Sequence, residues 1–125
     1  ILKLLWQGIS KYIKIYKIKI LMGCASFHGT NPSKFQDEFS LLYGNYRLPK
    51  TYDIKSLQHN EISFSKNINQ STILNRLPPL IKGYLRAGGM VSESFYIDRE
   101  FETIDYCVIM LTDKIVSRYQ NKFLN

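Results

Sequence analysis

Cysteine and histidine are scarce in this 125-residue chain, which contains only two of each. Cys24 and Cys107 stand far apart inside apolar runs, and they match neither a C-x-x-C pair nor any metal-ligand spacing. His28 and His59 are also isolated, so the sequence offers no set of ligands for a metal ion. We therefore predict no metal site, and buried free thiols of a reducing compartment rather than a disulfide.

Long apolar runs are missing as well. Lysines interrupt the apolar N-terminal segment every few positions, so it never reaches the roughly 18 apolar residues of a membrane span, and no signal peptide is visible. Acidic residues are outnumbered by 17 basic to 10, which gives a net charge of +7. Such a charge favours anionic partners, namely phospholipid surfaces, phosphates, an acidic carrier protein or nucleic acid. The 45% of hydrophobic residues can fill the core of one small domain.

Apolar periodicity predicts an α/β fold in which helices flank a mixed central sheet. The first helix carries an apolar stripe, including Leu4, Leu5 and Tyr12, that we expect to face the core, with lysines opposite. The stretch after it is apolar at odd and at even positions alike, as in a strand that is covered on both faces. Residues 47–75 show no lasting period and predict a long surface excursion. The predicted helices are 1–17, 32–44, 79–87 and 113–123, and the predicted strands are 18–27, 90–98 and 103–112.

Capping residues support two of these helices. Asn31 can cap a helix that begins at Pro32, because its side-chain oxygen accepts an orphan backbone N–H and proline needs no donor there. In the stretch "RLPPLIKGYLRAGG", Pro79 predicts the first turn, and Gly88 or Gly89 provides the exit with a positive φ. The expected inward residues of this short helix are Leu80, Ile81, Tyr84 and Leu85.

Three blocks of sequence, in a fixed order, carry a family resemblance: "LLWQGI" leading to "GCASFHGTNP", then "LPPLIKGYLRAGG", then "IDREFETIDYCVIML". From Leu4 to Phe123 they resemble the C-terminal half of the ornithine N-acyltransferases, hemolysin-like bacterial proteins of the GNAT superfamily. The family usually has Asn-Thr-Thr-Asp where this chain has residues 102–105, and a glycine-rich stretch where it has "SESF". The resemblance implies that residues 1–125 are the C-terminal part of one GNAT-like acyltransferase domain, without its N-terminal part.

The resemblance also implies an activity. A 3-hydroxyacyl group would move from acyl carrier protein to the α-amine of ornithine or a similar amino acid, in the synthesis of an amino-acid-containing membrane lipid. No cofactor is expected to stay bound, since the donor is the phosphopantetheine thioester of the carrier. A cytoplasmic enzyme, peripheral to the inner membrane, is the expected setting. Residues 1–20 should expose apolar surface or an unpaired strand edge, because the neighbouring strand of the whole fold is not in this chain.

Two aspartates are the candidate catalytic residues. Asp98 ends one predicted strand and Asp105 begins the next, so both can point at one opening. An amine loses a proton when it is acylated, and a carboxylate there can accept that proton or bind the ammonium group. Capping of the turn and solvation of the strand ends are the alternative interpretation. His28, at the end of its strand, is a further candidate base or an ordinary polar loop residue.

Five residues are candidates for substrate binding. In GNAT proteins the strand that would contain Gly23, Cys24 and Ser26 splays from its neighbour to admit the thioester. Cys24 fits core packing better than covalent catalysis, because the sequence identifies no base to activate it. Lys82 and Arg86, one helical turn apart, can grip the acidic carrier protein or the donor phosphate, or can form a solvated face.

Other functions remain open at this stage. The chain can be a non-catalytic remnant, or a fragment that binds a partner, of such an enzyme. The lysines of the first helix can contact an anionic membrane or form an ordinary solvated face. A nucleic-acid-binding domain would suit the calculated pI of about 9.4, but no recognised binding motif supports it, and we predict no nucleic-acid partner.

Overall fold

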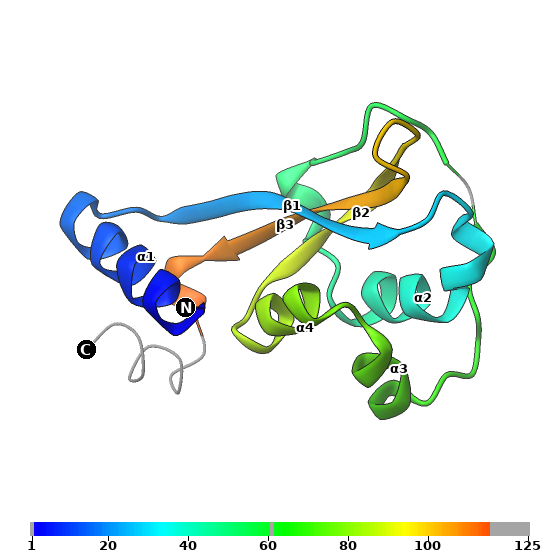
Figure 1. Ribbon diagram of the computed structural model, residues 1–125, viewed down its shortest axis with the longest axis horizontal. Helices are drawn as coiled ribbons and strands as arrows, with labels where there is room; N and C mark the ends of the chain where they lie inside the picture. Colours follow the sequence, from blue (N-terminus) through cyan, green and yellow to red (C-terminus); the bar gives the residue numbers. More distant parts are fainter. Residues whose placement is uncertain (1, 61, 116–125) are drawn as a thin grey trace.

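The computed structural model describes residues 2–60 and 62–115. A helix and a strand come first along these residues, three helices follow, and two strands come last, as Figure 1 shows. The helices are α1 (Leu2–Tyr16), α2 (Gln36–Asn45), α3 (Gln70–Arg76) and α4 (Pro79–Arg86), with short 3-10 helices η1 (Pro32–Phe35), η2 (Lys50–Tyr52) and η3 (Thr112–Lys114). The strands are β1 (Ile20–His28), β2 (Met90–Asp98) and β3 (Thr103–Leu111). All three predicted strands are therefore present, and the predicted α/β class is confirmed.

The three strands form one sheet in the order β1-β3-β2, with antiparallel pairing on both sides of β3. β2 and β3 make a hairpin, whose turn is closed by the side chain of Asp98. An isolated parallel bridge joins Arg47 to Val91 at the outer edge of β2. In the described part of the chain, no backbone hydrogen bond reaches the outer edge of β1. The sheet thus has one edge that is partly covered and one that is free.

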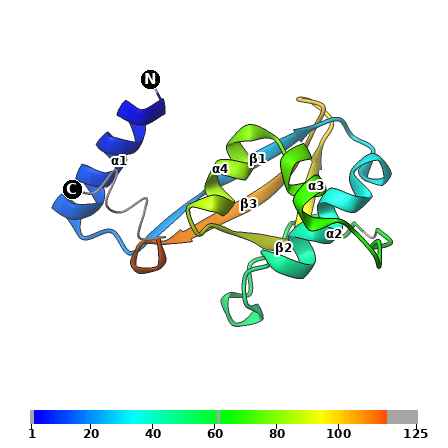
Figure 2. The same cartoon turned by 90° about the horizontal axis from the view of Figure 1, so that it is seen from below.

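Helices α2, α3 and α4 cover one face of the sheet, as the two views in Figures 1 and 2 show. Strand alternation turns every second side chain toward them. Phe27 of β1 and Ile104 of β3 pack there against Phe39 of α2 and Ile81 of α4, and all four are at most 2% exposed. Their aromatic rings meet edge to face, with Phe27 and Phe39 centroids 5.0 Å apart. This apolar layer fixes which side chains point to the other face.

The helix ends follow the predicted local chemistry. The Asn31 side chain accepts a hydrogen bond from the backbone N–H of Ser33, at 3.1 Å, and Pro32 begins the 3-10 turn that leads into α2. Gly88 follows α4 with φ of 107°, a conformation that only glycine adopts without strain. A partly buried ion pair joins α2 to α3, where Arg76 donates a hydrogen bond to Glu38.

The apolar stripe of α1 is where the predicted packing is wrong. Leu4 is 70% exposed and Leu5 is 58% exposed, and the side that faces the protein instead carries Trp6 and Ser10. The Trp6 ring meets Tyr84 of α4 edge to face at 5.9 Å. Most of the stripe that the sequence assigns to the core is therefore exposed. The separate prediction that residues 1–20 expose apolar surface is confirmed.

The predicted excursion of residues 47–75 holds η2 and most of α3, and it is anchored to the sheet. Leu48 donates its backbone N–H to Val91, and the Gln58 side chain makes two hydrogen bonds with the backbone of Ile97.

Leu80 of α4 is 49% exposed, so its predicted inward position is wrong. Of the predicted last helix, only η3 and Ile115 are described, and residues 116–123 lie outside the described residues. No helix within the described ranges combines the length and the apolar character needed to cross a membrane.

Candidate functional site

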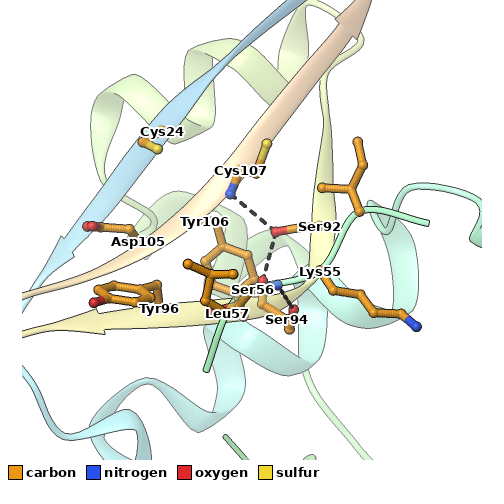
Figure 3. Close-up of a pocket in the computed structure, with 11 residues that line it drawn as sticks. Cys24, Lys55, Ser56, Leu57, Ser92, Ser94, Tyr96, Asp105, Tyr106 and Cys107 are labelled. Atoms are coloured by element: carbon orange, nitrogen blue, oxygen red, sulfur yellow. Dashed lines mark hydrogen bonds between the residues drawn. The ribbon is translucent and has the colours of Figure 1, made fainter. Parts of the chain in front are cut away.

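The face of the sheet opposite the helices carries a pocket of about 220 Å³. Figure 3 shows its lining, in which the three strands form the floor and residues 54–57 form one wall. We call it the sheet pocket. Its lining residues are Cys24, Ile54, Lys55, Ser56, Leu57, Ser92, Ser94, Tyr96, Asp105, Tyr106 and Cys107.

Strand register explains why polar and sulfur-containing side chains gather here. Ser26 of β1 lies directly opposite Asp105 of β3, and Cys24 lies opposite Cys107. Opposite residues of an antiparallel pair project from the same face of the sheet. The residues between them, such as Phe27 and Ile104, fill the core on the helix side. The same alternation therefore builds the core and the floor of the pocket.

Asp105 is held by hydroxyl groups. The Ser26 Oγ donates a hydrogen bond to Asp105 Oδ1 at 2.6 Å, and the Thr103 Oγ1 donates to the same oxygen at 2.8 Å. Neither donor is charged, and the residues that the structure describes form no ion pair with this carboxylate. No hydrogen bond to Oδ2 is present in the described part of the chain. That oxygen is thus available to bind an ammonium group or accept a proton.

A β-bulge in β2 shapes the side of the pocket. The register with β3 shifts between Val91 and Phe95, and Cys107 donates its backbone N–H to Ser92 Oγ at 3.2 Å. The Ser92 hydroxyl in turn donates to the carbonyl of Ser94 at 2.8 Å. The bulge hence replaces a ladder hydrogen bond by a serine side chain, which keeps Cys107 paired while the strand bends.

The wall of the pocket is fastened to this bulge. Ser56 donates its backbone N–H to Ser94 Oγ at 2.6 Å, which holds residues 54–57 beside the floor. Beyond this wall lies a larger hollow of about 700 Å³, whose lining shares five residues with the sheet pocket, namely Lys55, Ser56, Leu57, Ser94 and Tyr106. It is lined in part by Tyr43 and Phe64, whose rings stack at 4.5 Å. The larger hollow thus borders the sheet pocket, but only the sheet pocket is lined by Asp105.

The structure brings three of the predicted site residues together: Cys24, Ser26 and Asp105. Asp98 shares their sheet face by register, but its Oδ1 accepts hydrogen bonds from the backbone N–H groups of Glu100 and Phe101, each at 3.0 Å. It is the last residue of β2, next to the hairpin turn, and it does not line the sheet pocket. Turn capping therefore accounts for Asp98 more directly than a contact with substrate.

The other predicted site residues lie apart from the sheet pocket. Lys82 and Arg86 belong to α4, on the helix-covered side, and Lys82 Nζ donates to the carbonyl of Asn75 at 3.0 Å. Gly23 pairs with Val108 and lines an apolar hollow of about 230 Å³ beside Trp6, which shares only Cys24 with the sheet pocket. His28 is exposed at the end of β1 and is not part of the pocket lining. Lys82 and Arg86 therefore do not lie at the rim of the pocket that Asp105 lines, where they were predicted to lie.

The two thiols correct one prediction. Cys24 is exposed rather than buried, and Cys107 is half-buried, while both are free in this structure. Burial raises the pKa of the Cys107 thiol, and the neighbouring Cys24 raises it further. Among the described residues, no group of three or more histidine, cysteine or acidic side chains is placed to hold a metal ion.

The contribution of Ser92, Ser94 and Thr103 was not predicted from sequence. The "SES" stretch replaces the glycine-rich segment that the resembled family usually has, and this departure was the available signal. A serine hydroxyl can take over a backbone hydrogen bond at a bulge, but sequence alone does not show where a bulge falls.

The chain is similar in sequence to four known proteins over at least 94% of its length. It is 37% identical over 121 residues to the L-ornithine N(alpha)-acyltransferase of Brucella abortus. The matched region covers 94% of this chain and 43% of that relative. Proteins of the same name from Rhizobium meliloti and Rhodobacter capsulatus are 35% and 30% identical, over 97% and 94% of this chain. The chain is related to the L-ornithine N(alpha)-acyltransferases. The resemblance identified from the three sequence blocks is thereby confirmed.

The chain spans less than half the length of these ornithine acyltransferases, between 41% and 46%. No family model matches it. No solved structure matches it either. Its place as the C-terminal part of a GNAT domain stays a prediction.

Proposed function

We propose that the protein to which this chain belongs is an N-acyltransferase that acylates the α-amine of ornithine, or of a similar amino acid, for membrane lipid synthesis. The supporting observation is the 30–37% identity with four ornithine acyltransferases over at least 94% of this chain. The sheet pocket supports it chemically, because it offers one carboxylate with a free oxygen on an open face of the sheet.

The proposed role of Asp105 follows from the chemistry of amide formation. The amine nitrogen attacks the carbonyl carbon of the acyl thioester, so a C–N bond forms, the C–S bond breaks and the donor leaves as a thiolate that takes up a proton. The nitrogen must lose a proton in the process, and Asp105 Oδ2 accepts it directly or through a water molecule. The hydroxyls of Ser26 and Thr103 fix the orientation of the carboxylate by occupying Oδ1. Ser26 is thus a positioning residue.

Acyl carrier protein is the proposed donor, carrying the 3-hydroxyacyl group as a phosphopantetheine thioester. Lys82 and Arg86 are the proposed contacts for its acidic surface, since they lie on the same short helix and Arg86 is exposed. Because α4 lies on the other side of the sheet from Asp105, this contact would position the carrier without touching the reacting atoms. Charge reversal of both residues should weaken carrier binding, more strongly at low salt than at high salt.

Contact with an anionic membrane is the third part of the proposal. Residues 3–19 contain five lysines and no acidic residue, and α1 exposes apolar side chains such as Leu4 and Tyr12 beside them. A basic helix with an exposed apolar side binds the surface of anionic bilayers. This would place the enzyme near the membrane lipid pathway that uses its product.

The test is the acylation rate of the whole protein with an acylated carrier and ornithine. Asp105→Asn should lower turnover by roughly a hundredfold to ten-thousandfold, the usual worth of a general base. Asp98→Asn is the matched control, because asparagine keeps an oxygen that can accept the two turn N–H groups. The control should stay within a few-fold of wild type. Equal rates for Asp105→Asn and wild type would overturn the assignment of Asp105.

A further inference from the structure

The only two cysteines of the chain lie opposite each other on neighbouring strands. Cys107 donates its backbone N–H to Ser92 on the β2 side. In an extended strand the N–H and C=O groups of one residue point to the same side, so Cys107 turns its backbone away from β1. Cys24 and Cys107 are therefore a non-hydrogen-bonded pair, whose Cα atoms stand about 4.5 Å apart and whose side chains come closest.

This spacing is compatible with a covalent link. A disulfide requires Cα atoms about 4.4–6.8 Å apart and Cβ vectors that do not diverge. Directly opposite residues of an antiparallel pair meet both conditions, because their side chains leave the same face of the sheet. Figure 3 shows both cysteines among the residues that line the sheet pocket.

The two thiols differ in reactivity. Cys24 is exposed on an edge strand, so a small disulfide can reach it from solution. Cys107 is half-buried on the central strand, and burial followed by the neighbouring Cys24 raises its thiol pKa. A raised pKa leaves less thiolate at neutral pH, and the thiolate is the attacking form. Cys24 should react first with an external oxidant, and Cys107 should act as the resolving thiol.

We propose that Cys24 and Cys107 form a reversible thiol–disulfide pair in the sheet pocket, oxidised by a low-molecular-weight disulfide such as oxidised glutathione. The Cys24 thiolate attacks one glutathione sulfur, which forms a mixed disulfide and releases one glutathione thiolate. The Cys107 thiolate then attacks the Cys24 sulfur, which forms the Cys24–Cys107 bond and releases the second glutathione thiolate. Two electrons pass from the two thiols to the oxidant, and their two protons end on glutathione.

The oxidised pair changes the site beside it. It ties the edge strand β1 to the central strand β3 on the pocket floor, in the row next to Ser26 and Asp105. The bond remains open to solvent and to reducing thiols, and exposed disulfides are the readily reduced ones. The proposal does not depend on the acyltransferase activity, because it concerns only the two thiols and their register.

The experiment is a redox titration of the whole protein. Reduced protein is equilibrated with glutathione buffers, quenched with N-ethylmaleimide, digested without reduction and examined by mass spectrometry. The expected product is a linked pair of peptides that contain Cys24 and Cys107, two hydrogen atoms lighter than the separate peptides and cleaved by dithiothreitol. Its equilibrium constant in native buffer should exceed that in concentrated urea by about tenfold or more, because the native fold already holds the strands together.

Two single variants separate the steps. Cys107→Ser should stop at a glutathione adduct on Cys24, because the resolving thiol is missing. Cys24→Ser should leave Cys107 modified more slowly than Cys24 is modified in the other variant. A wild-type protein that keeps the Cys24 adduct without closing the bond would overturn the proposal. The same holds if the link forms equally well in urea, because the native register would then contribute nothing.

Discussion

The hydroxyl of Ser26 lies 2.6 Å from Asp105 Oδ1, across the directly opposed positions of β1 and β3. Because Thr103 donates to the same oxygen, two neutral hydroxyls orient the carboxylate and leave its second oxygen to the pocket. An ion pair would have bound the carboxylate to a cation and competed with an amine substrate. The two hydroxyls therefore fix the orientation of the Asp105 carboxylate without forming an ion pair with it.

Removal of the Ser26 hydroxyl should slow the proposed reaction without unfolding the protein. Ser26→Ala removes one hydrogen bond to a charged group, which is worth about 1.5–3 kcal/mol. Because Thr103 still holds Asp105, we expect roughly a tenfold loss of kcat/KM, near the lower end of that range. The measurement is steady-state acylation by the whole protein, with a urea unfolding curve beside it. Ser33→Ala, at an exposed serine of η1, is the control and should keep the wild-type rate.

Loss of the Arg76 side chain should destabilise the contact between α2 and α3. Glu38 is only 6% exposed, so Arg76→Ala leaves a buried carboxylate without its charged partner. Arg76 is itself half-exposed, which limits the expected cost to about 1–3 kcal/mol in the free energy of unfolding by urea.

The matched control for Arg76 is Asp53→Asn, which breaks an ion pair with Lys55 at 3.2 Å between side chains that are 74% and 73% exposed. That change should cost less than about 0.5 kcal/mol. If both variants lost the same small amount of stability, the buried pair would have no special role. The double variant Glu38→Gln, Arg76→Ala should recover part of the loss, because no unpaired charge remains.

Alkaline pH should destabilise the fold through Tyr106. Burial raises the pKa of this hydroxyl well above the usual value of about 10, so the folded protein keeps a proton that the unfolded chain releases. The contribution of Tyr106 to the free energy of unfolding is therefore full below about pH 10. It falls as the pH rises above that value, by about 1.4 kcal/mol for each further pH unit. Tyr106→Phe should remove this part of the slope in urea unfolding measured between about pH 9 and about pH 11. Tyr96→Phe, at an exposed tyrosine, should retain the wild-type slope.

Alanine at Gly88 should be costly, whereas alanine at Gly44 should be favourable. Gly88 has φ of 107°, and an added Cβ would lie 2.8 Å from the carbonyl oxygen of Lys114. We expect Gly88→Ala to lower the free energy of unfolding by about 1–2 kcal/mol or more. Gly44 lies within α2 with no atom within 4 Å of the added Cβ, so Gly44→Ala should stabilise by about 0.5–1 kcal/mol. Thermal unfolding of the two variants checks both signs, and a neutral Gly88→Ala would contradict the geometry.

The sequence predicted the elements better than it predicted their packing. The runs for β2 and β3 match the observed strands closely, at 90–98 and 103–111, because strand alternation and the turn between them are local properties. The apolar stripe of α1 was assigned to the core, since periodicity shows which side of a helix is apolar and not what lies against it. Leu80 was misplaced for the same reason, because a helix of barely two turns allows several inward faces.

For the candidate site too, the sequence predicted the residues of the strands better than the packing of the helix. Cys24, Ser26 and Asp105 were predicted, and the register of β1 with β3 brings them together. Lys82 and Arg86 were expected at the same opening, but α4 packs on the opposite face through Ile81 and Leu85. No pattern in a single sequence states which face of a sheet a helix will cover. The bulge at Ser92 was missed because it depends on tertiary bending of the strand.

The free outer edge of β1 has a practical consequence for anyone who purifies this chain by itself. Exposed N–H and C=O groups along a strand are a template for a second strand, and the exposed Ile20 and Met22 beside them add apolar contact. The isolated chain should therefore self-associate as its concentration rises, and sedimentation velocity across a dilution series would show heavier species at the concentrated end. Lys17 and Lys19 flank the edge and repel their counterparts at low ionic strength, so dilute, salt-poor buffers should keep the chain monomeric longest.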